Sequence, residues 1–363
     1  MARGRHEHPP RSPGAGSSSA RLMVTTAKPG DWPAEGVLAA VGNTPLVRLA
    51  RVFPNARFNL YAKLEGLNPG GSIKDRPARK IVSDALASGL LKPGMVVVES
   101  SSGNFAIGLA QACAYHGLRL ICVVDPKMTA QNIAILRAYG ATIEMVAERD
   151  PATGEFLPAR LARVRDLLDD LPDAFWPNQY ANRGNSAAHH QTMREIAGGL
   201  RDRVDYLFCS TSTCGTLRGC SEYVRARRMQ TQVVAVDALG SVIFGSPPAR
   251  RLIPGHGAAI RPPLYHPSLA DRVIHISDLE CISACRGVIQ REAILAGGSS
   301  GAVISAVYRL ISEIIPGSNC VAIFPDRGER YLETIYSDDW VRENFGEIPA
   351  PLGTVGAEQL AQA

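Results

Sequence analysis

The sequence has no apolar run of about 20 residues, the length that a membrane-spanning helix requires. It also has no large excess of charge of one sign, because 39 Lys and Arg stand against 34 Asp and Glu. Four arginines against one glutamate place +3 of the net charge of +5 in the first 21 residues, which leaves about +2 elsewhere. These absences predict a soluble globular protein that binds neither membranes nor nucleic acids.

The first residues, MARGRHEHPPRSPGAGSSSAR, lack the apolar segment of a secretory signal and are rich in Pro, Gly, Ser and Arg. We interpret residues 1–30 as a disordered tail. One alternative is a transit peptide, and another is that Met23 is the more natural start.

The eight cysteines include no C-x-x-C pair, so the sequence predicts neither a zinc site nor a disulfide framework. This usage fits a reducing compartment, and we expect the protein in the cytoplasm. Cys281 and Cys285 stand four residues apart in a helical stretch, and we expect two buried thiols on one helix face.

From residue 95 to 147, apolar β-rich runs alternate with amphipathic helical stretches. The runs MVVVES, LRLICVVD and TIEMVA predict strands, whereas SSGNFAIGLAQACAYHG and TAQNIAILRAYGA predict helices. The rhythm weakens between 148 and 190, where turn residues surround a short helical piece, and it resumes at DYLFC and QVVAVDA. This alternation predicts parallel sheets in an α/β, doubly wound fold, with a crossing between two domains at 148–190.

Four loops carry chemistry-bearing residues at predicted strand or helix ends. Lys74, in LNPGGSIKDRPARK, stands before a predicted helix that Ser72 could cap, and an amine there becomes a nucleophile if burial lowers its pKa. STSTCGT at 210–216 follows a strand and opens a helix, as a phosphate-binding turn does. SSSGN at 100–104 stands at another strand end, and GGSSGA at 297–302 opens a helix.

Each of these loops alone also fits an ordinary surface lysine, a strand-to-helix turn or a capped helix. The sequence has neither G-x-x-x-x-G-K-[ST] nor G-x-G-x-x-G, which counts against ATP and NAD. Together, an amine, a phosphate cradle and polar groups for a ring fit one molecule, pyridoxal 5'-phosphate.

On these loops and on GNTPLVRL at 42–49, the sequence resembles the fold-type-II pyridoxal-phosphate enzymes of the cysteine synthase group, from about residue 36 to 340. The resemblance implies two domains of the tryptophan synthase beta-like kind. The larger, cofactor-binding domain would comprise 31–67 and 180–345, the smaller mobile domain 68–179, and 346–363 would be a frayed C-terminal tail. A homodimer acting on small-molecule amino acids is also implied.

The resemblance assigns roles to particular residues. Lys74 would be the catalytic lysine that holds the cofactor covalently, Asn104 would bind the phenolic oxygen of its ring, and Ser299 would face its pyridine nitrogen. A neutral hydroxyl at Ser299 would leave the ring a weaker electron sink, which suits β-elimination. The phosphate loop would be Ser212, Thr213, Cys214, Gly215 and Thr216. The substrate carboxylate would bind Ser100, Ser101, Ser102 and Gly103.

Phe105 stands where cysteine synthases have a threonine after the asparagine. DPKMTAQNIAILRAYGA and FWPNQYANRGN look closer to a subgroup that makes N-(2-amino-2-carboxyethyl)-L-glutamate from O-phospho-L-serine and L-glutamate, on the way to 2,3-diaminopropionate for siderophores and peptide antibiotics. That function is the leading expectation. The alternatives are a cysteine synthase that uses O-acetylserine or O-phosphoserine with sulfide, a threonine or serine dehydratase, and a non-catalytic regulatory homologue.

Four arginines are candidates for binding the leaving phosphate or the glutamate, because guanidinium groups pair with carboxylates and phosphates. An exposed, solubilising role is the alternative for each. They are Arg218, Arg250, Arg251 and Arg261.

Overall fold

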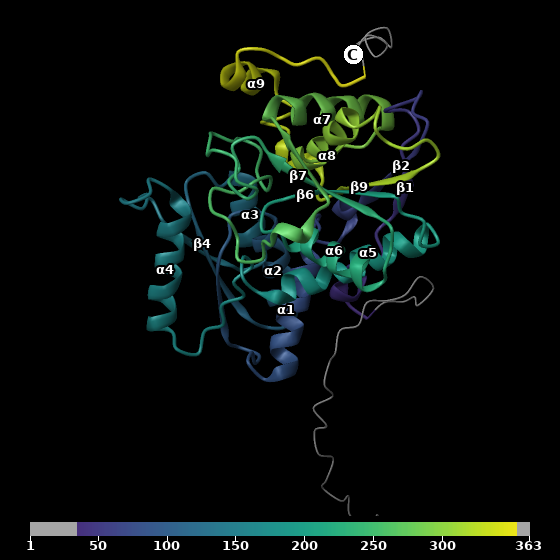
Figure 1. Ribbon diagram of the computed structural model, residues 1–363. Coiled ribbons are helices and arrows are strands. Elements are labelled where there is room, and N and C mark those ends of the chain that lie inside the picture. Colours follow the sequence, from purple (N-terminus) through teal and green to yellow (C-terminus); the bar gives the residue numbers. More distant parts are fainter. Residues whose placement is uncertain (1–34, 354–363) are drawn as a thin grey trace, which may run out of the picture.

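The computed structural model describes residues 35–353, and these form two parallel-stranded layers with helices on both faces (Figure 1). The predicted tail at 1–30 lies outside the described residues. Within 35–353, no helix is both long and apolar enough to cross a membrane. Short 3-10 helices η1 (Val37–Ala40), η2 (Glu65–Leu67), η3 (Pro267–Leu269) and η4 (Gly328–Tyr331) lie in the connections.

The larger sheet has six strands in the order β1-β2-β9-β6-β7-β8. Its strands are β1 (Leu46–Arg48), β2 (Asn59–Leu64), β6 (Tyr206–Ser210), β7 (Gln232–Ala238), β8 (Arg272–Ile276) and β9 (Asn319–Phe324). All neighbours are parallel except β1 and β2. Parallel strands need crossover connections, and the helices between them provide these.

Helices cover both faces of this sheet, which is why its central strands are apolar throughout. In β9, Val321 and Ile323 pack with α5 (Arg183–Gly199) and α6 (Gly215–Ala226). The alternate residues Cys320 and Ala322 pack with α7 (Asp278–Glu292) and α8 (Gly298–Arg309) on the opposite face. Cys281 and Cys285 of α7 are free, buried thiols in that second core, as expected.

The smaller sheet contains β3 (Val96–Ser100), β4 (Arg119–Val124) and β5 (Thr142–Met145), all parallel. On one face lie α1 (Asp75–Ser88), α2 (Asn104–Tyr115) and α3 (Ala130–Ala138). The predicted strands and helices of this region are confirmed, with ends shifted by a few residues. The doubly wound α/β prediction is likewise confirmed.

One helix is longer than the sequence indicated. The helical piece expected between 148 and 190 is α4 (Phe156–Asp170), and it covers the other face of the smaller sheet. Val164 and Leu167 pack there against Val96 and Val98, and this apolar stripe sustains 15 residues of helix between turn-rich flanks.

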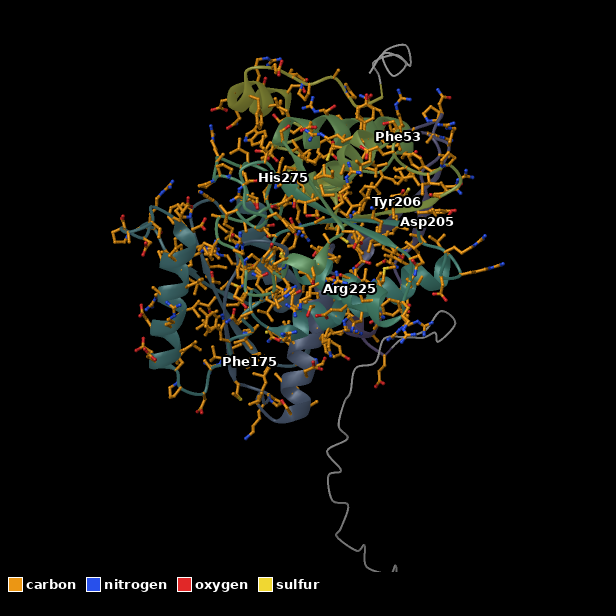
Figure 2. All side chains as sticks on the ribbon, in the orientation of Figure 1. Phe53, Phe175, Asp205, Tyr206, Arg225 and His275 are labelled. Atoms are coloured by element: carbon orange, nitrogen blue, oxygen red, sulfur yellow. The ribbon has the colours of Figure 1, made fainter. Side chains whose placement is uncertain are left out.

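After α4 the chain leaves the smaller sheet. Phe175, labelled in Figure 2, still lies beside β3, because its carbonyl accepts a hydrogen bond from Val98 N at 3.0 Å. The next helix, α5, packs on α6 and α1 instead. The sequence predicted a crossing between two domains at 148–190, and that division into domains stays a prediction.

The chain ends, within the described residues, along α7. After α9 (Asp338–Phe345), Leu352 N donates to Ser283 O at 3.0 Å, and Ser283 Oγ donates to Ala350 O at 2.6 Å. This part of the predicted C-terminal tail is therefore packed rather than frayed, because one main-chain and one side-chain hydrogen bond hold it to α7. Residues 354–363 lie outside the described residues.

Candidate functional site

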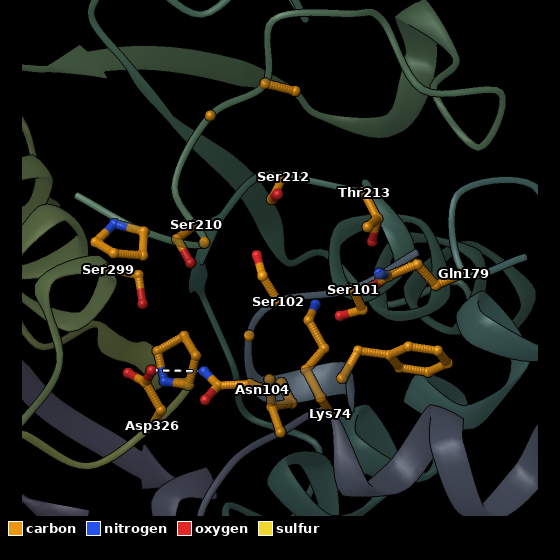
Figure 3. A pocket seen from close by; sticks show the side chains of 18 of the residues that line it. Lys74, Ser101, Ser102, Asn104, Gln179, Ser210, Ser212, Thr213, Ser299 and Asp326 are labelled. Atoms are coloured by element: carbon orange, nitrogen blue, oxygen red, sulfur yellow. Dashed lines mark hydrogen bonds between the residues drawn. The ribbon is translucent and has the colours of Figure 1, made fainter. Parts of the chain in front are cut away.

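A pocket of about 370 Å³ lies where strands of both sheets reach their carboxyl ends (Figure 3). The residues that follow β3, β6 and β9 line it, including Ser101, Ser212 and Asp326. All twelve residues predicted for the site line this pocket: Lys74, Ser100, Ser101, Ser102, Gly103, Asn104, Ser212, Thr213, Cys214, Gly215, Thr216 and Ser299. The loops that lie far apart in the sequence, from Lys74 to Ser299, thus meet at one place, while their individual roles stay predictions.

Main-chain pairing with the end of β9 positions Lys74. Ile73 N donates to Pro325 O at 2.7 Å, and Ser72 pairs with Asp326 in an isolated β-bridge. Lys74 then stands directly before α1, and its side chain points into the pocket (Figure 3). Ser72 was expected to cap this helix; instead its Oγ accepts the Lys74 amide at 3.2 Å, and the N-cap position belongs to Lys74 itself.

Burial lowers the pKa of the Lys74 amine, against the opposing effect of the nearby Asp326 carboxylate. A lowered pKa raises the share of neutral amine, the form that attacks an aldehyde or accepts a proton. Burial also raises the pKa of the Cys214 thiol to about 12, so this neighbour is protonated at neutral pH. Of these two groups, Lys74 is the one whose pKa is shifted toward neutral pH.

The turn between β6 and α6 has the shape of an anion cradle. Cys214, at the N-cap, has the left-handed φ of 63° and provides no side-chain cap to α6. A Cβ on Gly215 would lie 2.2 Å from Asn185 Oδ1, so only glycine fits there. Thr213 Oγ1 accepts from Gly215 N at 3.3 Å and from Asn185 Nδ2 at 3.2 Å. This arrangement leaves an uncapped helix N-terminus and hydroxyl groups available to a phosphate.

Asn104 belongs to a polar cluster that the sequence did not indicate. Its Nδ2 donates to Asp326 Oδ2 at 2.6 Å, drawn as the dashed line in Figure 3, and its Oδ1 accepts from Arg330. Tyr331 also donates to Asp326, whose pKa is raised by burial. The signal that could have found Asp326 is its place just after β9, since polar residues at such strand ends collect at one edge of a parallel sheet.

The loop from Ser100 to Gly103 offers several polar groups. Ser100 Oγ is buried and has no partner among residues 35–353, whereas Ser101 Oγ accepts from Ala106 N at 3.2 Å. Ser102 Oγ accepts from Arg160 Nη1 at 3.5 Å. Because α2 begins at Asn104 without a side-chain cap, this loop can bind a carboxylate with main-chain amides and hydroxyls. Phe105, by contrast, is buried in the core beneath the loop.

Ser299 lies 5% exposed at the start of α8, in the pocket wall. Asp326, which follows β9, lies very close to the start of this helix. A Cβ on Gly297 would lie only 1.9 Å from Asp326 Oδ1. The glycine pair before Ser299 thus lets the chain pass close to the polar cluster.

Of the four candidate arginines, only Arg251 lines the pocket. Arg218 pairs with Glu222 at 2.8 Å, and Arg250 donates to Asn344 Oδ1 at 3.0 Å. Arg261 donates to Ile243 O at 3.0 Å and lies over the Tyr265 ring. Arg160 and Arg330 also line the pocket, although the sequence did not indicate them.

Comparison with known proteins gives consistent matches. The family model described as "Pyridoxal-phosphate dependent enzyme" matches residues 37–326. N-(2-amino-2-carboxyethyl)-L-glutamate synthase of Ralstonia nicotianae is 46% identical over 309 residues, which are 85% of this chain and 91% of that protein.

Two solved structures are similar to this protein along most of its chain. Cysteine synthase of Entamoeba histolytica has a TM-score of 0.79 at 31% identity, covering 89% of this chain and 98% of that one. The O-acetylserine dependent cystathionine beta-synthase from Helicobacter pylori has a TM-score of 0.77 at 30% identity, covering 83% and 98%.

Proposed function

Because the chain belongs to the family of pyridoxal-phosphate dependent enzymes, we propose that it replaces the phosphate of O-phospho-L-serine with the amine of L-glutamate. The products are N-(2-amino-2-carboxyethyl)-L-glutamate and phosphate, and the first is a precursor of 2,3-diaminopropionate for siderophores or peptide antibiotics. The observation that carries this proposal is the 46% identity to the Ralstonia nicotianae synthase over most of both chains.

The charge of the pocket supports two acidic substrates. Besides Lys74, four cationic side chains and one carboxylate among the described residues line it: Lys127, Arg160, Arg251, Arg330 and Asp326. Phosphoserine and glutamate together carry more negative charge than O-acetylserine and sulfide. A cationic pocket therefore favours the first pair.

The pocket residues fit pyridoxal 5'-phosphate. Lys74 offers a buried amine with a lowered pKa for the aldehyde, and the turn from Ser212 to Thr216 offers an uncapped helix N-terminus for the phosphate. Asn104 and Ser299 would bind the polar edges of the ring. When bound, the cofactor withdraws electrons from Cα of the attached amino acid, which makes the Cα proton acidic.

In this proposal Lys74 accepts the Cα proton of phosphoserine and later returns a proton to Cα of the product. The loop from Ser100 to Gly103 holds the substrate carboxylate, so that the Cα proton faces the amine. The bond from Cβ to the ester oxygen breaks, and its electron pair leaves with phosphate. The glutamate nitrogen forms the new bond to Cβ and loses one proton, which balances the proton that the released phosphate takes up to become hydrogen phosphate.

We also propose that residues 68–179 form a smaller mobile domain that closes over the bound substrate and excludes water, against a larger domain of 31–67 and 180–345. The separate sheets and cores described above support this division. A cytoplasmic homodimer is proposed from the family resemblance alone.

Mass spectrometry of the products tests the function. With O-phosphoserine and glutamate, the enzyme should form N-(2-amino-2-carboxyethyl)-L-glutamate, and leaving out glutamate should remove that product. Cysteine formed efficiently from sulfide, with no product from glutamate, would identify a cysteine synthase instead. A keto acid formed without any second substrate would identify a dehydratase. A purified protein that stays colourless with added cofactor would indicate a non-catalytic homologue.

Asn104→Ala is expected to weaken cofactor binding by about 1–3 kcal/mol, because it deletes the side chain that would bind the phenolic oxygen of the ring, and losing one partner of a buried hydrogen bond usually costs this much. Titration of the apoenzyme with cofactor, followed by absorbance, measures this. Asn344→Ala, which alters a side chain paired with Arg250 outside the pocket, is the control. An unchanged cofactor affinity and spectrum for Asn104→Ala would exclude the ring-binding role.

A further inference from the structure

A second cavity lies between α1 and α5, and its volume of about 400 Å³ is within the range of small-molecule sites. The two helices pack directly on each other, although α1 covers the smaller sheet and α5 the larger one (Figure 1). None of the residues that line this cavity also lines the pocket of Lys74. The proposed reaction therefore gives this cavity no role.

Basic side chains dominate the lining of this cavity. Among the described residues, its lining contains four Lys and Arg side chains and one carboxylate: Arg76, Arg79, Lys80, Arg194 and Asp84. Lys80 and Asp84 pair with each other at 2.9 Å, and the charge of Arg76 is compensated inside the protein by the carboxylates described in the Discussion. Arg79 and Arg194 have no ion pair among residues 35–353.

The guanidinium of Arg79 has a donor without a partner. Nη2 donates to Gln191 Oε1 at 3.4 Å, whereas the buried Nη1 has no hydrogen-bond partner among residues 35–353. In the same part of the chain, the buried Oγ of Ser83 also has no partner. Burial, together with the charge of Arg76, lowers the pKa of Arg79 to about 10, so its guanidinium is still charged at neutral pH. Buried polar groups usually have partners, and an anion in the cavity would satisfy both of these.

A guanidinium nitrogen without a partner is not by itself unusual in this protein. Arg160, Arg251 and Arg286 each have one. However, Arg160 and Arg286 pair with Asp125 and Asp338, and Arg251 lines the pocket already described. The cavity between α1 and α5 combines such a nitrogen with a second unpaired arginine and with a buried hydroxyl that has no partner.

We propose that this cavity binds a small anion of the phosphate class, held by Arg79, Ser83 and Arg194. Guanidinium groups bind phosphate oxygens with paired N–H···O bonds, and a serine hydroxyl can donate one more. Arg79 and Ser83 stand four residues apart on one face of α1, and Arg194 belongs to α5, so the anion joins helices of the two sheets. Inorganic phosphate and a phosphomonoester both supply this chemistry. The proposal is independent of the proposed function.

Isothermal titration calorimetry of the holoenzyme tests the proposal, with inorganic phosphate, glycerol 3-phosphate or chloride added at constant ionic strength. Arg79→Gln and Arg194→Gln each remove one proposed contact. Arg183→Gln, which alters an exposed arginine of α5 outside the cavity, is the matched control. Thermal unfolding with and without phosphate gives a second readout, because a ligand that binds the folded state raises its stability.

The unmodified enzyme and Arg183→Gln should bind phosphate with the same Kd, and both should bind chloride far more weakly. Arg79→Gln should raise the Kd for phosphate about 10- to 100-fold, the usual effect of losing hydrogen bonds to a charged group. Arg194→Gln should raise it less, because Arg194 is exposed, and both variants should lose most of the phosphate-dependent rise in Tm. Tighter binding of glycerol 3-phosphate than of phosphate would support the site and identify a phosphomonoester as its ligand.

Two results would overturn the proposal. Equal phosphate affinity in all four proteins would place the anion elsewhere, for example in the pocket of Lys74. The other is an unmodified enzyme that binds no phosphate and forms a dimer that Arg79→Gln dissociates in size-exclusion chromatography. That result would assign the cavity to an acidic side chain of a second copy of the chain.

Discussion

Lys74→Ala is expected to lower turnover of O-phosphoserine by about 10³-fold or more, because the pocket then lacks its buried amine. Steady-state assays of product formation at saturating cofactor measure the loss. The variant should still fold, since the amine contributes no hydrogen bond to the structure among residues 35–353 and α1 begins after it.

Lys80→Ala is the matched control for this prediction. Lys80 lies on α1, near the surface, and pairs with Asp84 at 2.9 Å. It should keep nearly full activity. Normal turnover by Lys74→Ala, under conditions where Lys80→Ala is also active, would remove Lys74 from the mechanism.

Arg76→Met is expected to destabilise the protein by about 3–5 kcal/mol, the effect of leaving a buried charge without its partner. The Arg76 side chain is 2% exposed, and its Nε lies 2.6 Å from Glu65 Oε2. Its Nη2 lies 2.7 Å from Glu195 Oε2, which also pairs with Lys63 at 2.6 Å. Although burial alone would raise the pKa of Glu195, Arg76 and Lys63 lower it to about 2.

Chemical denaturation followed by circular dichroism measures the free energy of unfolding. Lys80→Met, on the same helix, removes an exposed (i, i+4) pair and should change that free energy by less than about 0.5 kcal/mol. Similar unfolding midpoints for Arg76→Met and Lys80→Met would show that the buried network contributes little net stability.

The sequence pattern alone predicted the strands and helices whose structure depends on residues close by in the chain. The apolar run QVVAVDA is β7, residue for residue, and the fold-type-II resemblance is confirmed by the family match and the solved structures. The pattern underestimated α4, because its helical stripe becomes apparent only against the face of the smaller sheet that it covers.

The polar partners in the site could not be found in this way, because they depend on contacts between distant segments. Asn104 meets Asp326 across 222 residues of sequence. Equally, nothing in the sequence separates Arg250 from Arg251, although one points to Asn344 and the other lines the pocket. The four arginines are equal candidates in the sequence, and only their contacts in the folded protein distinguish them.

The central claim is that Lys74 holds the cofactor, and reductive trapping tests it most directly. The holoenzyme is treated with borohydride, digested, and its peptides are sequenced by mass spectrometry. The account predicts a pyridoxyl group on Lys74 in the unmodified enzyme and in Lys80→Ala, and none in Lys74→Ala. A cofactor trapped on another lysine, or the same labelling in Lys74→Ala, would contradict it.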